Sequence, residues 1–188
     1  MLKLYCARTH GAEEHRVRYP GRTPRPGSGL AMSLLAYAVE DTWGIPLPEV
    51  GETETGTPVF PGHTDKHFSL SHTRGYVLAA VSDSPVGADI QSHRPLSAAL
   101  ERNLRLGADT WEPMEVWSIR EAVLKYHGRG DLRKPLELHR DGERVRIGDS
   151  GLICSLVRDI PDCACAVCTG DSEAAPELRW VKVSQLYT

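Results

Sequence analysis

The sequence lacks long apolar runs and any excess of positive charge. Its 188 residues carry 22 Lys and Arg against 25 Asp and Glu, which gives a formal net charge of −3 and a pI near 6.2. This balance provides no general attraction to nucleic acid or to acidic membrane surfaces, so any basic site must be local. No run approaches the roughly 20 apolar residues of a membrane span, and the opening MLKLYCARTHGAEEH lacks the apolar core and cleavage site of a signal peptide. We therefore expect a cytoplasmic protein that binds neither nucleic acid nor membrane.

Cysteine is scarce, and its arrangement argues against a disulfide framework. The five cysteines are an odd number, and three of them, Cys163, Cys165 and Cys168, are crowded together. A structural zinc site needs four ligands, and neither a second C-x-x-C pair nor a histidine pair completes the set. Cys163 and Cys165 alternate with alanines, which predicts a strand with small buried side chains. We expect this cluster to belong to the core, with metal or redox use as the alternative.

Linkers and low-complexity tracts are absent as well, which indicates one domain over residues 1–188. Helical spacing of apolar residues predicts three helices, and alternating residues predict strands around them. The predicted helices are Ser28–Trp43, Leu96–Leu106 and Thr110–Tyr126. A strand, a helix and three strands occur in an N-terminal half of about 1–92 and again in a C-terminal half of about 93–188. This repetition suggests a duplicated α+β unit.

The densest pattern in the sequence lies in the run HFSLSHTRGYVLAAVSDSPVGADIQ, residues 67–91. His67–Ser71 alternates in polarity, which predicts a strand with one buried face. Tyr76–Val81 is apolar at every position, which predicts a strand covered on both faces. After a turn, a third strand would project Asp89 and Gln91 to the same side, two residues apart. An acid and an amide on a strand of small apolar residues would suit a hard cation that takes oxygen ligands.

A second run, TWEPMEVWSIREAVLKYHGRG, predicts a helix with further charged side chains. Thr110 is placed to cap this helix, Pro113 is tolerated in its first turn, and Gly128 can end it. Within the helix, Glu121 and Lys125 are four residues apart and therefore share one face. Together with the strand acid, they provide two carboxylates and a lysine, a set that suits a magnesium-bound diphosphate.

Three motifs occur in order along the chain: HFSLSHT at 67–73, VGADIQ at 86–91 and WSIREAVLK at 117–125. Together they resemble the signature of the 4'-phosphopantetheinyl transferase superfamily, of the surfactin-synthetase-activating type. The family pattern is roughly His-Phe-x-x-Ser-His, Gly-x-Asp-x-Glu and Trp-x-x-Lys-Glu-Ala-x-x-Lys. The resemblance implies an α+β fold of two pseudo-twofold-related α/β halves, with the active site in the cleft between them. It also implies a monomer, because one chain contains both halves.

The resemblance implies a reaction as well. In this family the 4'-phosphopantetheine arm of coenzyme A is transferred to a serine hydroxyl of an acyl or peptidyl carrier protein. Magnesium is the cofactor, and adenosine 3',5'-bisphosphate is released. The chemistry needs a cation at the diphosphate, a base near the incoming hydroxyl and positive charge for the leaving phosphate. Such carriers serve fatty-acid, polyketide or nonribosomal peptide synthesis, and the sequence does not indicate which of these is served.

The family's roles can be carried to this chain by position. Asp89, Gln91 and Glu121 would bind magnesium, and Glu121 would deprotonate the serine directly or through a metal-bound water. Lys125 would contact the phosphates and share the catalytic role. The expected contacts to coenzyme A are Ser71, His72, Asp89, Lys125, Arg22 and Arg25, with the two arginines near the 3'-phosphate.

The sequence departs from the family pattern at three positions. Gln91 stands where many relatives carry a second acid, so the site has one fewer negative charge, although the amide oxygen can still act as a ligand. Arg120 replaces a lysine, which keeps the charge and changes its geometry. Thr57 stands where a cationic residue usually precedes a proline, so it offers the nucleotide at most a hydroxyl.

Other interpretations remain open. The chain could be a non-catalytic relative that binds coenzyme A or a carrier protein, or a hydrolase of small nucleotide diphosphates that uses the same acids. Taken singly, His72 could be a hydrogen-bonded histidine at a strand end, and Glu121 with Lys125 a surface ion pair. Arg22 and Arg25 could simply face solvent in a loop.

Overall fold

The structure is a computed structural model that describes residues 1–9, 28–108, 110–170 and 175–186. The chain forms both helices and strands in an α+β arrangement, as expected. The elements in order are β1 (Leu2–Arg8), α1 (Ser28–Trp43), β2 (Gly51–Glu52), β3 (Pro58–Val59), β4 (His67–Thr73), β5 (Tyr76–Ser82), β6 (Gly87–Ser92), α2 (Ala98–Arg105), α3 (Pro113–His127), β7 (Leu138–Asp141), β8 (Arg144–Ile147), β9 (Leu152–Leu156), β10 (Cys163–Gly170), β11 (Glu177–Val181) and a 3-10 turn (Val183–Leu186).

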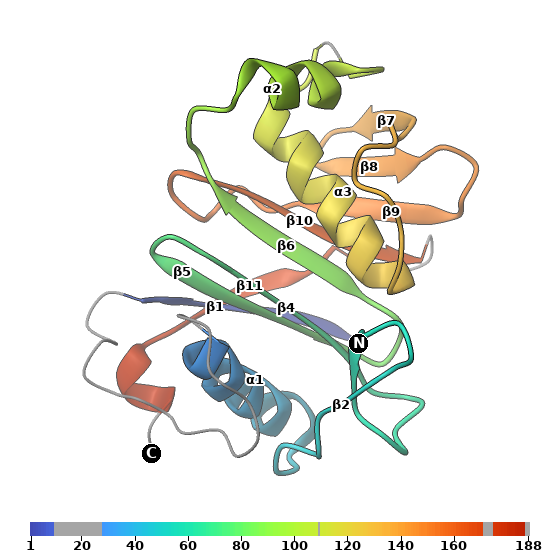
Figure 1. The fold of residues 1–188 in the computed structure, drawn as a ribbon. Helices are drawn as coiled ribbons and strands as arrows, with labels where there is room; N and C mark the ends of the chain where they lie inside the picture. The colour runs from blue at the N-terminus through green and yellow to red at the C-terminus, as the bar shows by residue number, and fades with distance from the viewer. Residues whose placement is uncertain (10–27, 109, 171–174, 187–188) are drawn as a thin grey trace.

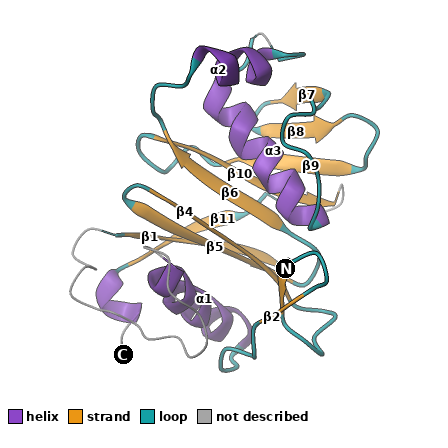
Figure 2. Ribbon diagram, viewed as in Figure 1, coloured by secondary structure: helices purple, strands orange, loops and turns teal. Residues whose placement is uncertain are grey.

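Two β-sheets form the middle of the molecule, as Figure 1 shows by position in the chain and Figure 2 by type of element. The first sheet has the strand order β11-β1-β5-β4 and the second β6-β10-β9-β8-β7. Because β1 pairs in parallel with β11 and antiparallel with β5, the last strand of the chain returns to the sheet of the first. β4 and β6 are edge strands of their respective sheets, and they contact each other.

Each sheet is covered on its outer face by a helix, so the layers run helix, sheet, sheet, helix (Figure 1). The α1 side chain Leu35 packs against the first sheet, and the α3 side chain Ile119 packs against the second; both are fully buried. A third core joins the inner faces of the two sheets and includes Leu4, Cys6, Leu78, Ala80, Ala88, Ile90, Cys165 and Val167. Strands β1, β5, β6 and β10 are therefore covered on both sides.

Several expectations from the sequence are confirmed. The first helix has the predicted bounds, and β5 is buried on both faces. The segment containing Cys163, Cys165 and Cys168 forms β10, and the last two of these side chains are buried in the core. The proposed division into halves of about 1–92 and 93–188 stays a prediction, and the sheets themselves place β6 with the C-terminal strands and β11 with the N-terminal ones.

Two expectations are wrong. The β4 strand does not have one solvent face, because Ser69 and Ser71 are as well buried as Phe68, each at 6 or 7% exposure. The reason is that β6 covers this side of the strand. The helix α3 is not capped by Thr110. Glu112 is the N-cap residue, and its carboxylate accepts from the backbone nitrogens of Met114 and Glu115 near the helix start.

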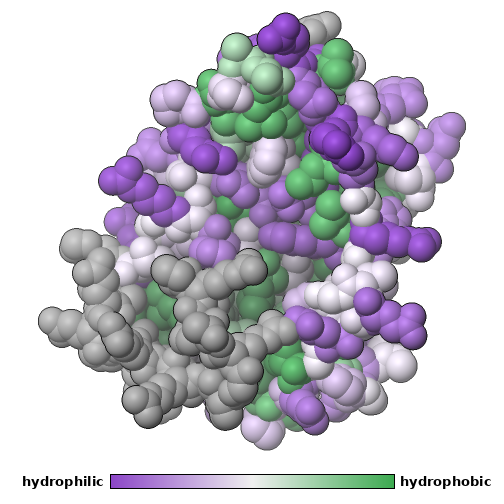
Figure 3. Space-filling model, viewed as in Figure 1, coloured by the Kyte–Doolittle hydropathy of each residue, from purple (hydrophilic) through white to green (hydrophobic). Residues whose placement is uncertain are grey.

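The surface is polar with scattered apolar patches. On the face drawn in Figure 3, hydrophilic side chains are spread over the second sheet and its helices, and hydrophobic side chains appear between them in separate groups. Among the described residues, no helix is both long enough and apolar enough to cross a membrane.

Candidate functional site

The centre of the candidate site is the carboxylate of Asp89, which is only 2% exposed. Its Oδ1 accepts from the Ser71 hydroxyl at 2.7 Å and from Lys125 Nζ at 2.7 Å. Its Oδ2 accepts from the Gln91 side-chain nitrogen at 3.0 Å. A buried carboxylate needs such partners, because burial without them strongly disfavours its charged form. The structure therefore brings together Asp89, Gln91, Lys125 and Ser71, all four of which the sequence had singled out.

A glycine sets the distance between β6 and α3 at this point. A Cβ on Gly87 would clash with the carbonyl oxygen of Ala122 and would lie 2.5 Å from the backbone nitrogen of Tyr126. Only a residue without a side chain allows the strand to approach the helix backbone this closely. Since side chains alternate along a strand, Asp89, two residues on, faces the same helix. The motif Val-Gly-x-Asp thus positions the acid against the helix that carries Lys125.

Glu121 lies one helical turn before Lys125 and faces the same group. It is partly buried, and its pKa is raised above the usual value of 4.5, first by burial and then by the negative charge of Asp89; the Lys125 ammonium works in the opposite direction. The effect of Asp89 on Glu121 shows that the two carboxylates lie within electrostatic reach of each other. Two acids thus share one lysine, which leaves the cluster with surplus negative charge.

Three hydroxyls of β4 hold β6 in place where backbone pairing between the two edge strands is missing. Ser69 Oγ accepts from the backbone nitrogen of Ala88 at 2.9 Å, Ser71 Oγ from that of Ile90 at 3.2 Å and Thr73 Oγ1 from that of Ser92 at 2.9 Å. We call Ser69, Ser71 and Thr73 the hydroxyl series. The sequence analysis missed Ser69 and Thr73; the signal was the alternation Ser-x-Ser-x-Thr, which puts three hydroxyls on one face of a strand.

Two pockets lie on either side of Ser71 and Asp89 along the strands. The smaller, of about 280 Å³, is lined by Lys125, the segments 55–58 and 68–70, Leu124 and Gly128. The larger, of about 680 Å³, is lined by Gln91 together with residues 73–76, 92–94 and 161–163. The cluster around Asp89 therefore contributes one side chain to each pocket.

The remaining predicted contacts lie elsewhere. His72 is exposed, and because it alternates with Ser71 its side chain leaves β4 on the opposite face. Neither of the two pockets beside Asp89 includes it in its lining. Arg22 and Arg25 lie outside the described residues. In the described part of the chain, no group of three or more His, Cys, Asp and Glu side chains is arranged to hold a metal ion.

Sequence comparison with curated proteins finds several relatives of this chain. Over 116 residues the chain is 30% identical to the 4'-phosphopantetheinyl transferase psf-1 of Bacillus pumilus, covering 54% of this chain and 49% of that protein. Over 153 residues it is 28% identical to the 4'-phosphopantetheinyl transferase Sfp of Bacillus subtilis, covering 71% and 68%. Another 4'-phosphopantetheinyl transferase of Bacillus subtilis is 25% identical over 76% of this chain and 62% of its own length. The chain is therefore similar to members of the 4'-phosphopantetheinyl transferase superfamily.

The match to this superfamily is partial in length. The aligned segment spans about half of psf-1 and about two thirds of Sfp. No family model matches the chain. The similarity therefore rests on the curated relatives alone.

Thr57 has a structural contact. Its hydroxyl donates to the carbonyl oxygen of Gly128 at 3.2 Å, and Gly128 ends α3 in the left-handed conformation with φ 67°. A Cβ on Gly128 would clash with the Thr57 hydroxyl oxygen. The segment around Thr57 is thereby held against the end of α3, on the wall of the smaller pocket.

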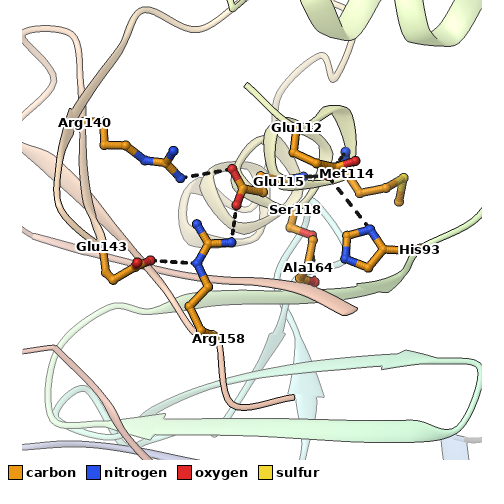
Figure 4. Close-up of polar contacts among 9 residues, drawn as sticks. All are labelled: His93, Glu112, Met114, Glu115, Ser118, Arg140, Glu143, Arg158 and Ala164. Atoms are coloured by element: carbon orange, nitrogen blue, oxygen red, sulfur yellow. Dashed lines mark hydrogen bonds and ion pairs between the residues drawn. The ribbon is translucent and has the colours of Figure 1, made fainter. Parts of the chain in front are cut away.

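The other end of α3 carries a second buried acid, shown in Figure 4. Glu115, 6% exposed, accepts from Arg140 at 3.0 Å and forms a short ion pair with Arg158. Arg158 also donates to Glu143 at 2.8 Å, and the Arg140 guanidinium stacks on Trp111 at 4.3 Å from the ring centroid. Sequence analysis did not find this group, because its members come from three separate segments with no shared motif.

Proposed function

We propose that the protein is a magnesium-dependent 4'-phosphopantetheinyl transferase that acts on coenzyme A and an acyl or peptidyl carrier protein. The carrier's serine oxygen forms a bond to the phosphorus that bears the pantetheine arm. The bond from that phosphorus to the bridging oxygen of the diphosphate breaks, and adenosine 3',5'-bisphosphate leaves. The serine proton passes to a base on the enzyme. The curated names of the relatives support this reaction class.

The observation that carries the proposal is the surplus of negative charge around Asp89. A buried carboxylate and a second carboxylate with a raised pKa share a single lysine among the charged neighbours that the structure describes. A purely structural ion pair needs only one acid for that lysine. The extra acid, Glu121, is explained if a cation joins the group when substrate binds.

The donor set fits magnesium, which prefers oxygen ligands. Each carboxylate oxygen offers about two lone pairs. Oδ1 of Asp89 already accepts from Ser71 and Lys125, whereas Oδ2 accepts only from Gln91, so Oδ2 has room for a cation. Glu121 and the Gln91 amide oxygen would complete the protein ligands. Bound magnesium would neutralise the diphosphate charge and polarise the phosphorus under attack.

The side chains of this chain would then divide the remaining tasks. Lys125 places a positive charge one turn from Glu121 and would contact the phosphates of coenzyme A. Glu121 is our candidate base, because a carboxylate whose pKa is raised by burial is a better proton acceptor than an ordinary one. The contacts to the nucleotide end are proposed as His72, Arg22 and Arg25, in the site between the two pseudo-twofold halves.

The test uses mass spectrometry. The protein is incubated with coenzyme A, magnesium and an apo carrier protein, and the carrier is weighed. We expect the carrier to gain the mass of the 4'-phosphopantetheine arm, and we expect Asp89→Ala and Glu121→Ala each to abolish that gain while circular dichroism shows folded protein. No gain with wild type points to a non-catalytic binding protein, and loss of coenzyme A without a carrier points to a hydrolase. Substantial residual activity in either variant would show the ligand assignment to be wrong.

A further inference from the structure

The hydroxyl series differs in what its members touch. Among the described residues, the Ser69 hydroxyl forms hydrogen bonds only with the Ala88 backbone: it accepts from the nitrogen and donates to the carbonyl oxygen at 3.4 Å. Thr73 contacts Ser92 through both the backbone nitrogen and the side-chain oxygen. Ser71 alone reaches a charged group, because its hydroxyl hydrogen goes to Oδ1 of Asp89. All three hydroxyls accept a backbone N–H of β6, and only the Ser71 hydroxyl also donates to a carboxylate, that of Asp89.

The contact to Asp89 occupies the only hydrogen of the Ser71 hydroxyl. A serine hydroxyl has one hydrogen to donate, and here the Asp89 carboxylate accepts it at 2.7 Å. Its oxygen accepts the N–H of Ile90, and the residue is 6% exposed. While Asp89 is ionised, this hydrogen is not available to a phosphate oxygen. The role expected from sequence, direct contact to the nucleotide, therefore competes with the contact that the structure contains.

We propose that Ser71 is a positioning residue that acts through Asp89, fixing the orientation of its carboxylate for a divalent cation. The inference rests on the proposed function, in which Asp89 is a cation ligand. Ser71 and Lys125 occupy Oδ1 from two directions, so Oδ2 is the oxygen presented toward Gln91. Groups that orient a ligand in this way typically contribute tenfold or more to metal affinity. Without Ser71, only the flexible lysine holds Oδ1.

The experiment measures binding of Mn²⁺ alone, a cation that accepts the same oxygen ligands, to the full chain without coenzyme A or carrier. Free Mn²⁺ is followed by electron paramagnetic resonance. We expect Ser71→Ala to weaken binding by roughly tenfold. Ser71→Thr keeps the hydroxyl and should bind within about threefold of wild type, since affinity changes mainly when the orienting partner is lost.

Ser69→Ala is the matched control. It removes the same hydroxyl from the same strand at the same burial, and it also loses a contact to a β6 N–H group. Its thermal midpoint should fall about as much as that of Ser71→Ala, whereas its Mn²⁺ affinity should stay unchanged. Ser71→Cys, with a similar shape and only a weak donor, serves as the second loss variant if the alanine protein unfolds.

The outcomes separate the inference from the function on which it rests. If wild type binds no Mn²⁺, the proposed cation site itself fails. If wild type binds and Ser71→Ala binds equally well, or if Ser69→Ala loses as much affinity as Ser71→Ala, the positioning role is overturned. Selective loss in the Ser71 variants, with retention in Ser71→Thr, supports it.

Discussion

The two ends of α3 each hold a buried carboxylate, and the two differ in how their charge is balanced. Asp89, which faces the C-terminal part of the helix, is met by one lysine and by neutral donors, and a second acid, Glu121, lies within electrostatic reach. Glu115, in the first helical turn, is met by Arg140 and Arg158. Of the two groups, only the first has more acids than bases among the described residues, and this imbalance is the one on which the proposed cation site rests.

The position on the helix adds to this difference. A negative side chain in the first turn is favoured by the helix dipole, so Glu115 is stabilised by its location as well as by its arginines. It links α3 to strand β7 through Arg140 and to the segment after β9 through Arg158. We infer that a buried acid in this protein marks function when its charge is left unbalanced and marks structure when arginines saturate it.

The largest expected effect comes from a substitution that prevents β6 from lying close to α3. In Gly87→Ala the new Cβ meets helix backbone, which cannot move aside as a flexible side chain can. We expect a loss of about 3 kcal/mol in the free energy of unfolding, at the upper end for an overpacked site, together with loss of transfer activity. Urea denaturation and the carrier mass assay measure the two effects.

Gly170→Ala provides the control for this substitution. Gly170 lies at the end of β10, and a Cβ there would meet no atom within 4 Å. The change should stay within about 0.5 kcal/mol of wild type. Equal stability of Gly87→Ala and Gly170→Ala would mean that the glycine does not set the distance between strand and helix.

The next largest effect is expected at the other end of α3, where two arginines balance the charge of Glu115. Glu115→Gln leaves Arg140 and Arg158 without their shared acid, although both arginines are partly exposed and can be hydrated. We expect a loss of about 2 kcal/mol, below the usual cost of breaking a fully buried pair. The rate of transfer per folded molecule should remain at the wild-type level. A strong fall in that rate, measured below the melting temperature, would contradict the division into functional and structural acids.

At the end of α3 near Asp89, we expect a smaller effect on stability, and one of opposite sign. The pKa of Glu121 is raised, so its ionised form destabilises the folded protein once the pH exceeds that pKa. This destabilisation disappears below the unfolded value of 4.5, because Glu121 is then protonated in both the folded and the unfolded state. In EDTA at pH 7.5, Glu121→Gln should therefore melt about 2 °C higher than wild type. At pH 4 the difference should vanish. Magnesium should raise the melting temperature of wild type and leave the variant unchanged.

Sequence reasoning singled out the residues of the candidate site because strand alternation and helical spacing are local rules. They place Asp89 beside Gln91, and Glu121 beside Lys125, on defined faces before any fold is known. They could not show that Ser71 donates to Asp89, because that contact joins two edge strands of different sheets. The α3 cap was misplaced for a related reason: several nearby residues can cap, and only the backbone decides that Glu112 does.

The Glu115 group shows the limit of local rules most clearly. Its two arginines lie 25 and 43 residues from the acid along the chain, and nothing in the spacing of Arg140 or Arg158 marks them as partners. Their meeting depends on how the second sheet twists past α3. Long-range pairing of this kind requires the assembled sheet.

The smallest effect is expected from the outer acid of the balanced group. The Glu143 side chain is 58% exposed and its partner Arg158 47% exposed, so water and salt screen their attraction. Glu143→Gln should cost about 0.5 kcal/mol or less at low salt and nothing measurable at about 1 M salt, whereas the loss in Glu115→Gln should persist at both. The double variant then measures the coupling between the two acids through Arg158. A coupling near zero assigns the stabilisation to Glu115 alone. A large coupling energy means that the two glutamates and the two arginines act together, so that Asp89 would have to be compared with this whole group of charges and not with Glu115 alone.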